Sequence, residues 1–197
     1  YGDHRDLHSF PTRRSSDLVQ VEGPGGAGFL TDVTGVSAGG DHSAAVKEDG
    51  TVWAWGSNSR GQLGDGTTTG SESPVQVLGP GGVGFLTGVK AVHAGRTHTV
   101  ALKDDGTVWA WGDNENGQLG DDTTTERVTP VQVVSPWGAG FLADITAIAA
   151  GDRHTAALMA GLNAGIWTWG ENQYGELGTD DTGDRDKPAF VKGSDGT

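Results

Sequence analysis

The stretch AGRTHTVALKDDGTVWAWGDNENGQLG, residues 94–120, decides the fold, because close copies of it stand on both sides of it in the chain. Its Trp-Ala-Trp-Gly run at 109–112 also occurs at 53–56, and a third version, Trp-Thr-Trp-Gly, stands at 167–170. The copies that start at 53 and 109 are 56 residues apart, and the third follows after 58. A fixed period of this length is typical of repeat proteins, in which each unit buries its apolar surface against its neighbours.

Four short runs in the middle copy favour β-strands, namely 89–94, 99–103, 108–111 and 131–133. Gly95 separates the first pair, and Asp105-Gly106, a dipeptide preferred in tight hairpins because it tolerates positive φ, separates the second. Each run therefore returns antiparallel to the one before it. Pro130 at the start of the last run suits an edge strand, where a missing N–H costs little.

Both faces of the third run are apolar, since the two Trp side chains point one way and Val108 and Ala110 the other. A sheet that is apolar on both faces has to be sandwiched, and radial stacking of blades achieves this. We therefore predict an all-β fold, a β-propeller with three four-stranded antiparallel blades. The predicted segments are an outer strand and linker at 19–32, blades at 33–77, 89–133 and 145–191, linkers at 78–88 and 134–144, and a truncated end at 192–197.

Residues 94–120 and their two copies resemble the repeat of the regulator of chromosome condensation (RCC1) family, in a form that suggests a bacterial protein. The resemblance covers residues 19–191. It implies a propeller of seven blades, so that this chain is an open part of one. Members include a guanine-nucleotide exchange factor, an ultraviolet photoreceptor and an inhibitor of a bacterial enzyme, so the resemblance specifies the fold more narrowly than the function.

Residues 1–18 resemble the translation of a common short-read sequencing adapter, and we expect them to pack against nothing. They contain three acidic and three basic residues, so the net charge without them is still −13. Such an acidic chain, with no basic run elsewhere, is unsuited to phosphate backbones, and we expect no direct nucleic-acid partner. No apolar run approaches the roughly 20 residues of a membrane span. There is no cysteine.

No motif of a known catalytic or cofactor site is present, and we predict neither enzymatic activity nor a cofactor. The acidic residues of 179–186 (Asp180, Asp181, Asp184 and Asp186) offer oxygen ligands, but their spacing matches no EF-hand, and a solvated loop is the better interpretation. The photoreceptor branch carries Trp in a Gly-Trp-Arg-His-Thr loop. Gly40, Arg96 and Asp152 stand at that position here, which argues against light sensing.

Histidines recur at one repeat position, and tryptophans at two. Residues related by a propeller axis lie on separate blades and do not converge on one site, so we interpret these side chains as structural. They are His42, His98 and His154, with Trp53, Trp55, Trp109, Trp111, Trp167 and Trp169.

Positions that differ between the copies are the ones that can specify a partner. Most lie in the loops after the first and third runs, which strand reversal places at one end of the propeller. The candidate protein-binding residues there are Arg60, Arg96, Glu115, Arg153 and Tyr174. A second, smaller group at the opposite end is Trp137, which replaces Gly25 and Gly81, and Leu162 in the lengthened turn.

The sequence thus predicts a protein-binding scaffold, which we expect to be secreted by a bacterium or to lie at its cell surface. The open blade faces also make self-association possible. The alternative from a different class is an exchange-factor-like regulator, or a propeller module of a larger enzyme, with a site in the central channel.

Overall fold

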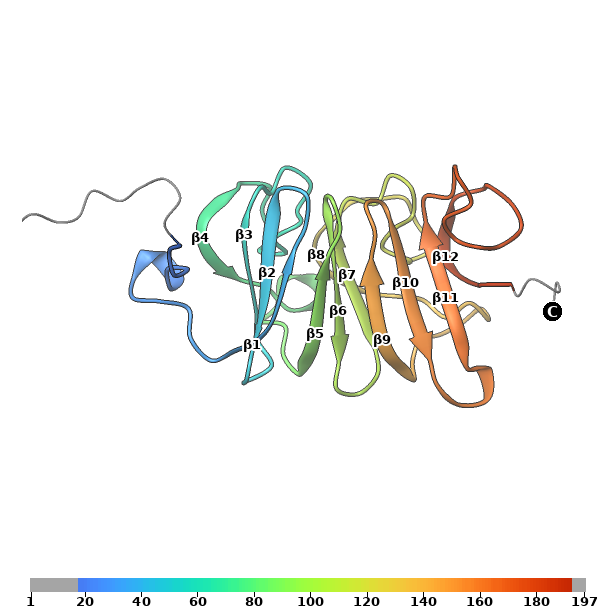
Figure 1. The fold of residues 1–197 in the computed structure, drawn as a ribbon, viewed down its shortest axis with the longest axis horizontal. Coiled ribbons are helices and arrows are strands. Elements are labelled where there is room, and N and C mark those ends of the chain that lie inside the picture. Colours follow the sequence, from blue (N-terminus) through green and yellow to red (C-terminus); the bar gives the residue numbers. More distant parts are fainter. Residues whose placement is uncertain (1–17, 193–197) are drawn as a thin grey trace, which may run out of the picture.

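A computed structural model describes residues 18–192 as an all-β protein of three separate four-stranded sheets (Figure 1). The described residues contain no α-helix, only three single turns of 3-10 helix, η1 (Pro24–Gly26), η2 (Pro80–Gly82) and η3 (Gly161–Asn163). The first sheet contains β1 (Val33–Ala38), β2 (His42–Lys47), β3 (Val52–Gly56) and β4 (Ser71–Gln76). The second contains β5 (Val89–Ala94), β6 (His98–Lys103), β7 (Val108–Gly112) and β8 (Arg127–Gln132). The third contains β9 (Ile145–Ala150), β10 (His154–Met159), β11 (Gly165–Gly170) and β12 (Arg185–Phe190).

Each sheet is an antiparallel meander in chain order, as predicted. The hairpin turn differs from the expected one. Gly106 N donates to Lys103 O at 3.0 Å and Lys103 N to Thr107 O at 3.0 Å, and in this loop only Gly106 has positive φ, at 79°. The turn therefore closes three residues with a glycine bulge, and Asp105 contributes by accepting the Thr107 N–H on its side chain at 3.0 Å.

The fourth strand is longer than the sequence suggested, because its pairing is irregular. Ala110 pairs with Val131, but Gly112 pairs with Arg127, so three residues of β8 are passed over between these partners. Gly112, at φ 105°, bends β7 at this point. The expectation of a strand confined to 131–133 is therefore wrong, and Pro130 lies inside edge strand β8 rather than at its start.

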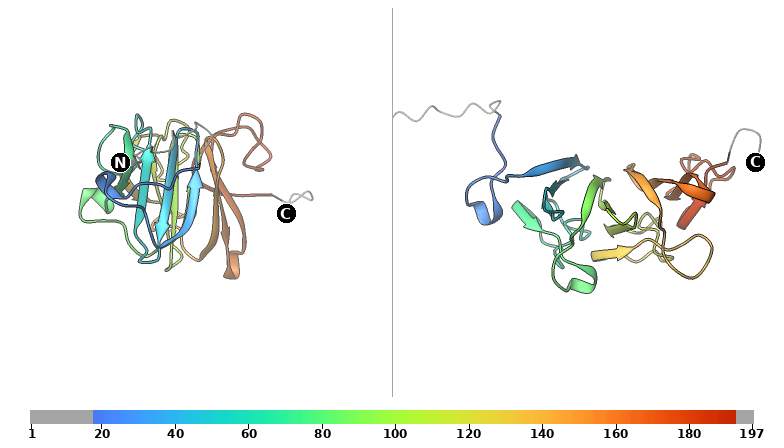
Figure 2. Two further views of the ribbon diagram at one scale, coloured as in Figure 1. Left: turned by 60° about the vertical axis from the view of Figure 1, so that its left-hand side comes forward. Right: turned by 90° about the horizontal axis from the view of Figure 1, so that it is seen from below.

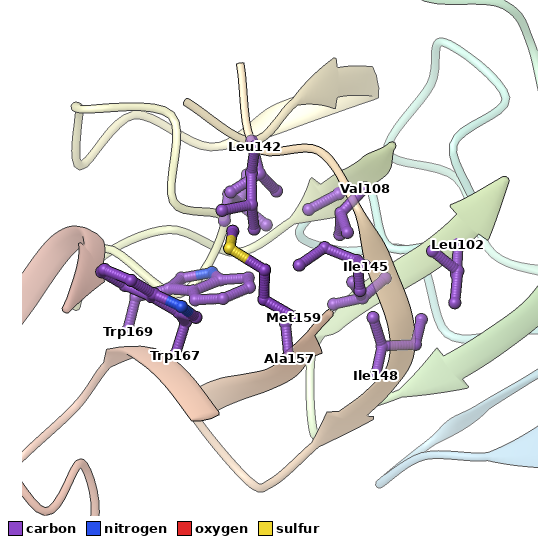
Figure 3. Packing of buried hydrophobic residues seen from close by; sticks show 13 residues of the cluster. Leu102, Val108, Leu142, Ile145, Ile148, Ala157, Met159, Trp167 and Trp169 are labelled. Carbon is purple, nitrogen blue, oxygen red and sulfur yellow. The ribbon is translucent and has the colours of Figure 1, made fainter. Parts of the chain in front are cut away.

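The three sheets stand side by side in an arc, with their first strands β1, β5 and β9 nearest one another and their fourth strands spread apart (Figure 2). The sheets meet through two apolar layers. In the layer between the second and third sheets, one apolar cluster contains Leu102, Val108, Ile148, Ala157 and the fully buried Trp169 (Figure 3). Trp111 fills the equivalent place between the first and second sheets. This is the radial stacking of blades predicted from the two apolar faces of each sheet.

The N-terminal part differs from the prediction. Val19, Gln20 and Val21 are exposed and form no strand. The only pairing in this segment is an isolated bridge between Glu22 and Phe29. An outer strand needs the third strand of its own blade beside it, and nothing in residues 18–192 supplies one. Of the adapter-like segment 1–18, only Leu18 lies within the described residues, and its side chain is exposed.

Candidate functional site

The connections between strands divide the molecule into two ends (Figure 1). The loops β1–β2 and β3–β4, with their counterparts in the other sheets, lie at one end, which we call the loop end. The β2–β3, β6–β7 and β10–β11 turns lie at the other, the turn end. The five predicted binding residues belong to the loop end, and Trp137 and Leu162 to the turn end.

Arg60 and Arg96 reach from one sheet to the next. The Arg60 guanidinium lies 2.8 Å from Glu115 and 3.6 Å from Glu126, both in the second sheet's β7–β8 loop, and Glu115 raises the pKa of Arg60. Arg96 lies 3.6 Å from Asp152, and its backbone N–H donates to Asp152 O at 3.0 Å. Both arginines remain partly exposed, so each retains donors for a partner while it bridges two blades.

Tyr174 and Arg153 make fewer side-chain contacts with neighbouring blades within the described residues. The Tyr174 side chain is 89% exposed, and its backbone N–H donates to Glu176 at 2.9 Å. Tyr174 stands at the repeat position of Arg60 and of Asn116, whose side chain donates to Asp184 of the third sheet at 2.9 Å. This position therefore spans two blades wherever a following blade is present. Arg153 is half-buried and forms no ion pair within residues 18–192.

At the turn end, the third unit has apolar side chains at two positions where the other units have Gly or Lys. Met159 replaces the lysine of the second unit, Lys103, whose ammonium lies 6.0 Å from the centroid of the Trp109 ring. Trp137 is 58% exposed and packs edge-on against Trp167, with ring centroids 5.1 Å apart. A cavity of about 540 Å³ lies beside Trp137, and Leu162 contributes to its wall.

The repeated histidines lie between blades. His42 is buried, and its Nε2 lies 2.8 Å from Thr99 Oγ1 of the next sheet, while His98 Nε2 lies 3.2 Å from Thr155 Oγ1. Thr99 in turn donates to Gln62 O at 2.9 Å, back in the first unit. Burial lowers the pKa of His42 to about 4 and that of His98 to about 3, against a weaker opposing effect of Asp41 and of Asp113 respectively.

The threonine half of this arrangement was missed from the sequence. A hydroxyl residue follows the histidine in every copy, as Ser43, Thr99 and Thr155, and that regularity was the available signal.

A second missed residue organises the long loops. Asn114 is fully buried, accepts the Leu119 N–H at 2.9 Å and donates to Asp121, Thr123 O and Thr125 O. Asn58 and Asn172 hold the equivalent loops in the same way. The loop end is therefore a set of ordered loops, on which the side chains that differ between copies are held in place.

Residues 18–192 contain no group of three His, Cys, Asp or Glu side chains arranged to hold a metal. The acidic segment 179–186 is occupied by other contacts: Asp181 pairs with Arg185, and Asp184 accepts the Asn172 backbone N–H at 2.9 Å. Within the same part of the chain, no helix has the length and apolar character needed to cross a membrane.

Family comparisons agree with the repeat. The regulator of chromosome condensation (RCC1) repeat matches residues 49–102, 105–158 and 163–197, and a second description of that repeat matches 33–62, 89–118 and 145–176. The first set is offset from the sheets: residues 49–102 run from the β2–β3 turn of the first sheet into β6 of the second. One such repeat therefore joins two blades.

Several known proteins are similar. Human probable E3 ubiquitin-protein ligase HERC6 is 38% identical over 82% of this chain and 15% of its own length, and the Arabidopsis thaliana ultraviolet-B receptor UVR8 is 34% identical over 76% and 32%. Among solved structures, human WBSCR16 has a TM-score of 0.67 at 26% identity, covering 82% of this chain and 39% of its own. Prp20p of Saccharomyces cerevisiae has 0.68 at 19%, covering 84% and 40%. The chain thus spans less than half the length of each.

Proposed function

Because this chain belongs to the regulator of chromosome condensation (RCC1) repeat family, we propose that it is a protein-binding β-propeller scaffold with no catalytic activity of its own. Prp20p, which shares the fold, is described by its binding to Gsp1p and histones, and was also solved bound to Kap60. Those partners belong to the yeast protein. They support the class of partner that we propose here, namely another protein.

The observation that carries the proposal is the contrast between the blades and the loop end. The packing residues between blades remain apolar at equivalent positions, whereas the exposed loop residues differ in chemical type and include Arg and Tyr, types enriched at interface hot spots. We propose that the partner contacts Arg60, Arg96, Glu115, Arg153 and Tyr174. Rigid loops limit the entropy lost on binding, which favours recognition by this end.

We also propose that the partner is not nucleic acid, because the net charge is −13. Two of the exposed loop-end arginines, Arg60 and Arg96, are already paired with carboxylates. A phosphate backbone would have to compete with those carboxylates.

One observation favours a second candidate, a propeller module within a larger enzyme. Human HERC6 and HERC3 are named as ubiquitin ligases, and this chain matches 15% and 14% of their lengths. In that case the scaffold would present a substrate or regulator to a catalytic domain elsewhere. Sequencing the complete gene distinguishes the two candidates, because a fused catalytic domain would be visible directly.

A position-specific crosslink tests the scaffold proposal. A photoreactive side chain placed at Tyr174 on the loop end should capture a defined protein from the source organism, and one placed at Phe85 on the turn end should not. Equal capture at both positions, or capture at Phe85 only, would contradict the assignment of the surface.

A further part of the proposal is self-association through the open blade faces.

A further inference from the structure

The cavity beside Trp137, which we call the third-unit cavity, has a charged counterpart in the first unit. That counterpart has a volume of about 330 Å³ and is lined by Asp32, Lys47, Glu48 and Asp49. In the third unit, Asp144 stands at the repeat position of Asp32, and Met159 at that of Lys47. The third-unit cavity therefore keeps the carboxylate of its counterpart but lacks the lysine.

The opening of the third-unit cavity does not depend on the blade that comes next. Its lining comes from the linker 134–144, which leads into the third sheet, and from the β10–β11 connection of that same sheet. The counterpart in the first unit is open although the second sheet is in place beside it, where Val89 N donates to Gly50 O at 3.1 Å. A following blade therefore leaves a cavity at this position open.

Aromatic and aliphatic side chains form most of the wall. Trp137, Phe141 and Leu162 contribute exposed side chains, and the buried Met159 contributes as well. Trp137 is held in place, because its ring packs on Trp167 and its backbone N–H donates to the Ser135 hydroxyl at 3.3 Å. An indole is the aromatic group that attracts a cation most strongly.

One ionisable side chain, the exposed Asp144, is present among the described residues that line the third-unit cavity. Its counterpart Asp32 accepts a hydrogen bond from the Thr31 hydroxyl at 2.9 Å, but Ala143 stands at the position of that threonine. Within residues 18–192, the Asp144 carboxylate forms no ion pair. The cavity therefore presents an uncompensated negative charge beside aromatic rings.

The other two units show which cation suits this position. Lys47 lines the counterpart cavity of the first unit, and the ammonium of Lys103 in the second unit lies 6.0 Å from the centroid of the Trp109 ring. A lysine can pack its aliphatic stem along apolar groups while its ammonium stays near water and carboxylates. The third unit has Met159 instead, so it cannot supply this group from its own chain.

We propose that the third-unit cavity binds a lysine side chain of a partner protein. The lysine stem lies along Trp137 and Leu162, and the ammonium lies near the Asp144 carboxylate and the aromatic rings. The net charge of −13 favours a basic segment over a neutral one. This inference goes beyond the proposed function and does not depend on it, because it assigns a second site at the end opposite to the loop end.

Peptide titration tests the ligand class. The probe is acetyl-Gly-Lys-Gly-amide, added to the chain labelled with a fluorinated tryptophan, and the fluorine resonance of Trp137 is identified by its absence from Trp137→Gly. We expect a saturable shift of this resonance with a dissociation constant on the order of 1–10 mM. The same peptide with norleucine in place of lysine keeps the stem but lacks the charge, and it should bind about fivefold or more weakly. Lysine-peptide binding should weaken between about 0.05 M and 0.5 M sodium chloride, because salt screens the attraction.

Three variants test the location. Asp144→Asn should weaken binding of the lysine peptide by about 2- to 5-fold, as expected for an exposed charge pair. Asp32→Asn, which removes the equivalent carboxylate from the counterpart cavity, is the matched control and should bind like the wild type. Met159→Lys restores the lysine of the other units and should abolish the shift, because the cavity is then occupied from within. Circular dichroism confirms that each variant is folded.

The absence of a shift at Trp137, or equal affinity for the lysine and norleucine peptides, would overturn the proposal. So would equal effects of Asp144→Asn and Asp32→Asn, because the carboxylate of the third unit would then have no particular role. The peptide and its readout involve the turn end alone, whereas the loop-end proposal is read from capture at Tyr174. Failure of one proposal can therefore be told from failure of the other.

Discussion

His42 and His98 each bind a hydroxyl whose own proton is already used. Thr99 Oγ1 donates to Gln62 O, so in the His42 pair the ring must supply the proton from Nε2. This tautomer leaves Nδ1 without a proton, and in both rings Nδ1 is buried with no partner among the described residues. Burial is the main cause of the lowered pKa of both rings, and protonation would in addition create a buried donor with no acceptor among the described residues.

The lowered pKa values predict acid sensitivity in a defined window. Both folded-state values, about 4 for His42 and about 3 for His98, lie below the ordinary 6.5. The unfolded chain therefore binds protons first, and stability that is complete above pH 6.5 is lost as the pH falls below it. The loss approaches about 1.4 kcal/mol per pH unit for each histidine. Urea unfolding at pH 7 and pH 5 measures it.

These carboxylates affect stability only at lower pH than this window, because the pKa values of Asp49, Asp105 and Asp181 are lowered below 3.8. His98→Gln should reduce the difference between pH 7 and pH 5. Equal free energies of unfolding of the wild type at the two pH values would contradict the claim that the buried histidines are neutral and have lowered pKa values.

Position 95 requires glycine because the imidazole ring of His98 lies directly against it. A Cβ built on Gly95 would lie 2.2 Å from His98 Cε1 and 2.7 Å from Gly151 O, distances that no packing tolerates. Gly95→Ala should therefore destabilise the chain by about 1–3 kcal/mol or more, because the two blades have to separate. Gly35→Ala is the matched control, because Gly35 lies within β1 and a Cβ there meets nothing within 4 Å. Thermal melting of both variants gives the comparison. Equal melting temperatures would contradict the close contact between Gly95 and the His98 ring.

At the scale of the element, the third strand of each sheet carries a Trp pair with two different roles. Trp111 of β7 is fully buried between sheets and donates to Gln62 O, whereas Trp109 is half-buried and lies near Lys103. Trp111→Ala should cost about 3–5 kcal/mol of unfolding free energy. Trp109→Ala should cost clearly less, because much of that ring already contacts water. Chemical denaturation of the two variants tests this order, and a reversed order would mean that the strand faces are assigned the wrong way round.

Much of the element structure followed from the sequence, because the repeat shows which positions are equivalent and the alternation shows which faces are apolar. The beginning of β8 did not, because the irregular pairing of Gly112 with Arg127 depends on a neighbouring strand rather than on local preference. The five candidate residues were predicted to lie at one end of the sheets, and the structure places their loops there, while their role in binding stays a prediction. The pairing of Arg60 with Glu115 and Glu126 was not foreseen, since it joins loops of different blades.

At the scale of the whole molecule, the three described blades are stacked with an equivalent apolar layer between each pair. The chain belongs to the RCC1 repeat family, and the shared fold with WBSCR16 and Prp20p follows from that repeat. Under the proposed function, variation confined to the loop end and the turn end would change the partner without changing the packing of the blades. Arg60 and Arg96 belong both to the contacts between blades and to the exposed surface of the loop end.

The central claim is that a protein partner binds the loop end, and the dissociation constant of the captured partner tests it most directly. Arg96→Ala and Tyr174→Ala should each raise that constant by about 5- to 30-fold, equivalent to about 1–2 kcal/mol. The melting temperature should hardly change, because the exposed pair between Arg96 and Asp152 contributes little to stability. An unchanged dissociation constant in these two variants, together with loss of binding in Trp137→Ala and Leu162→Ala, would contradict the account and place the partner at the turn end.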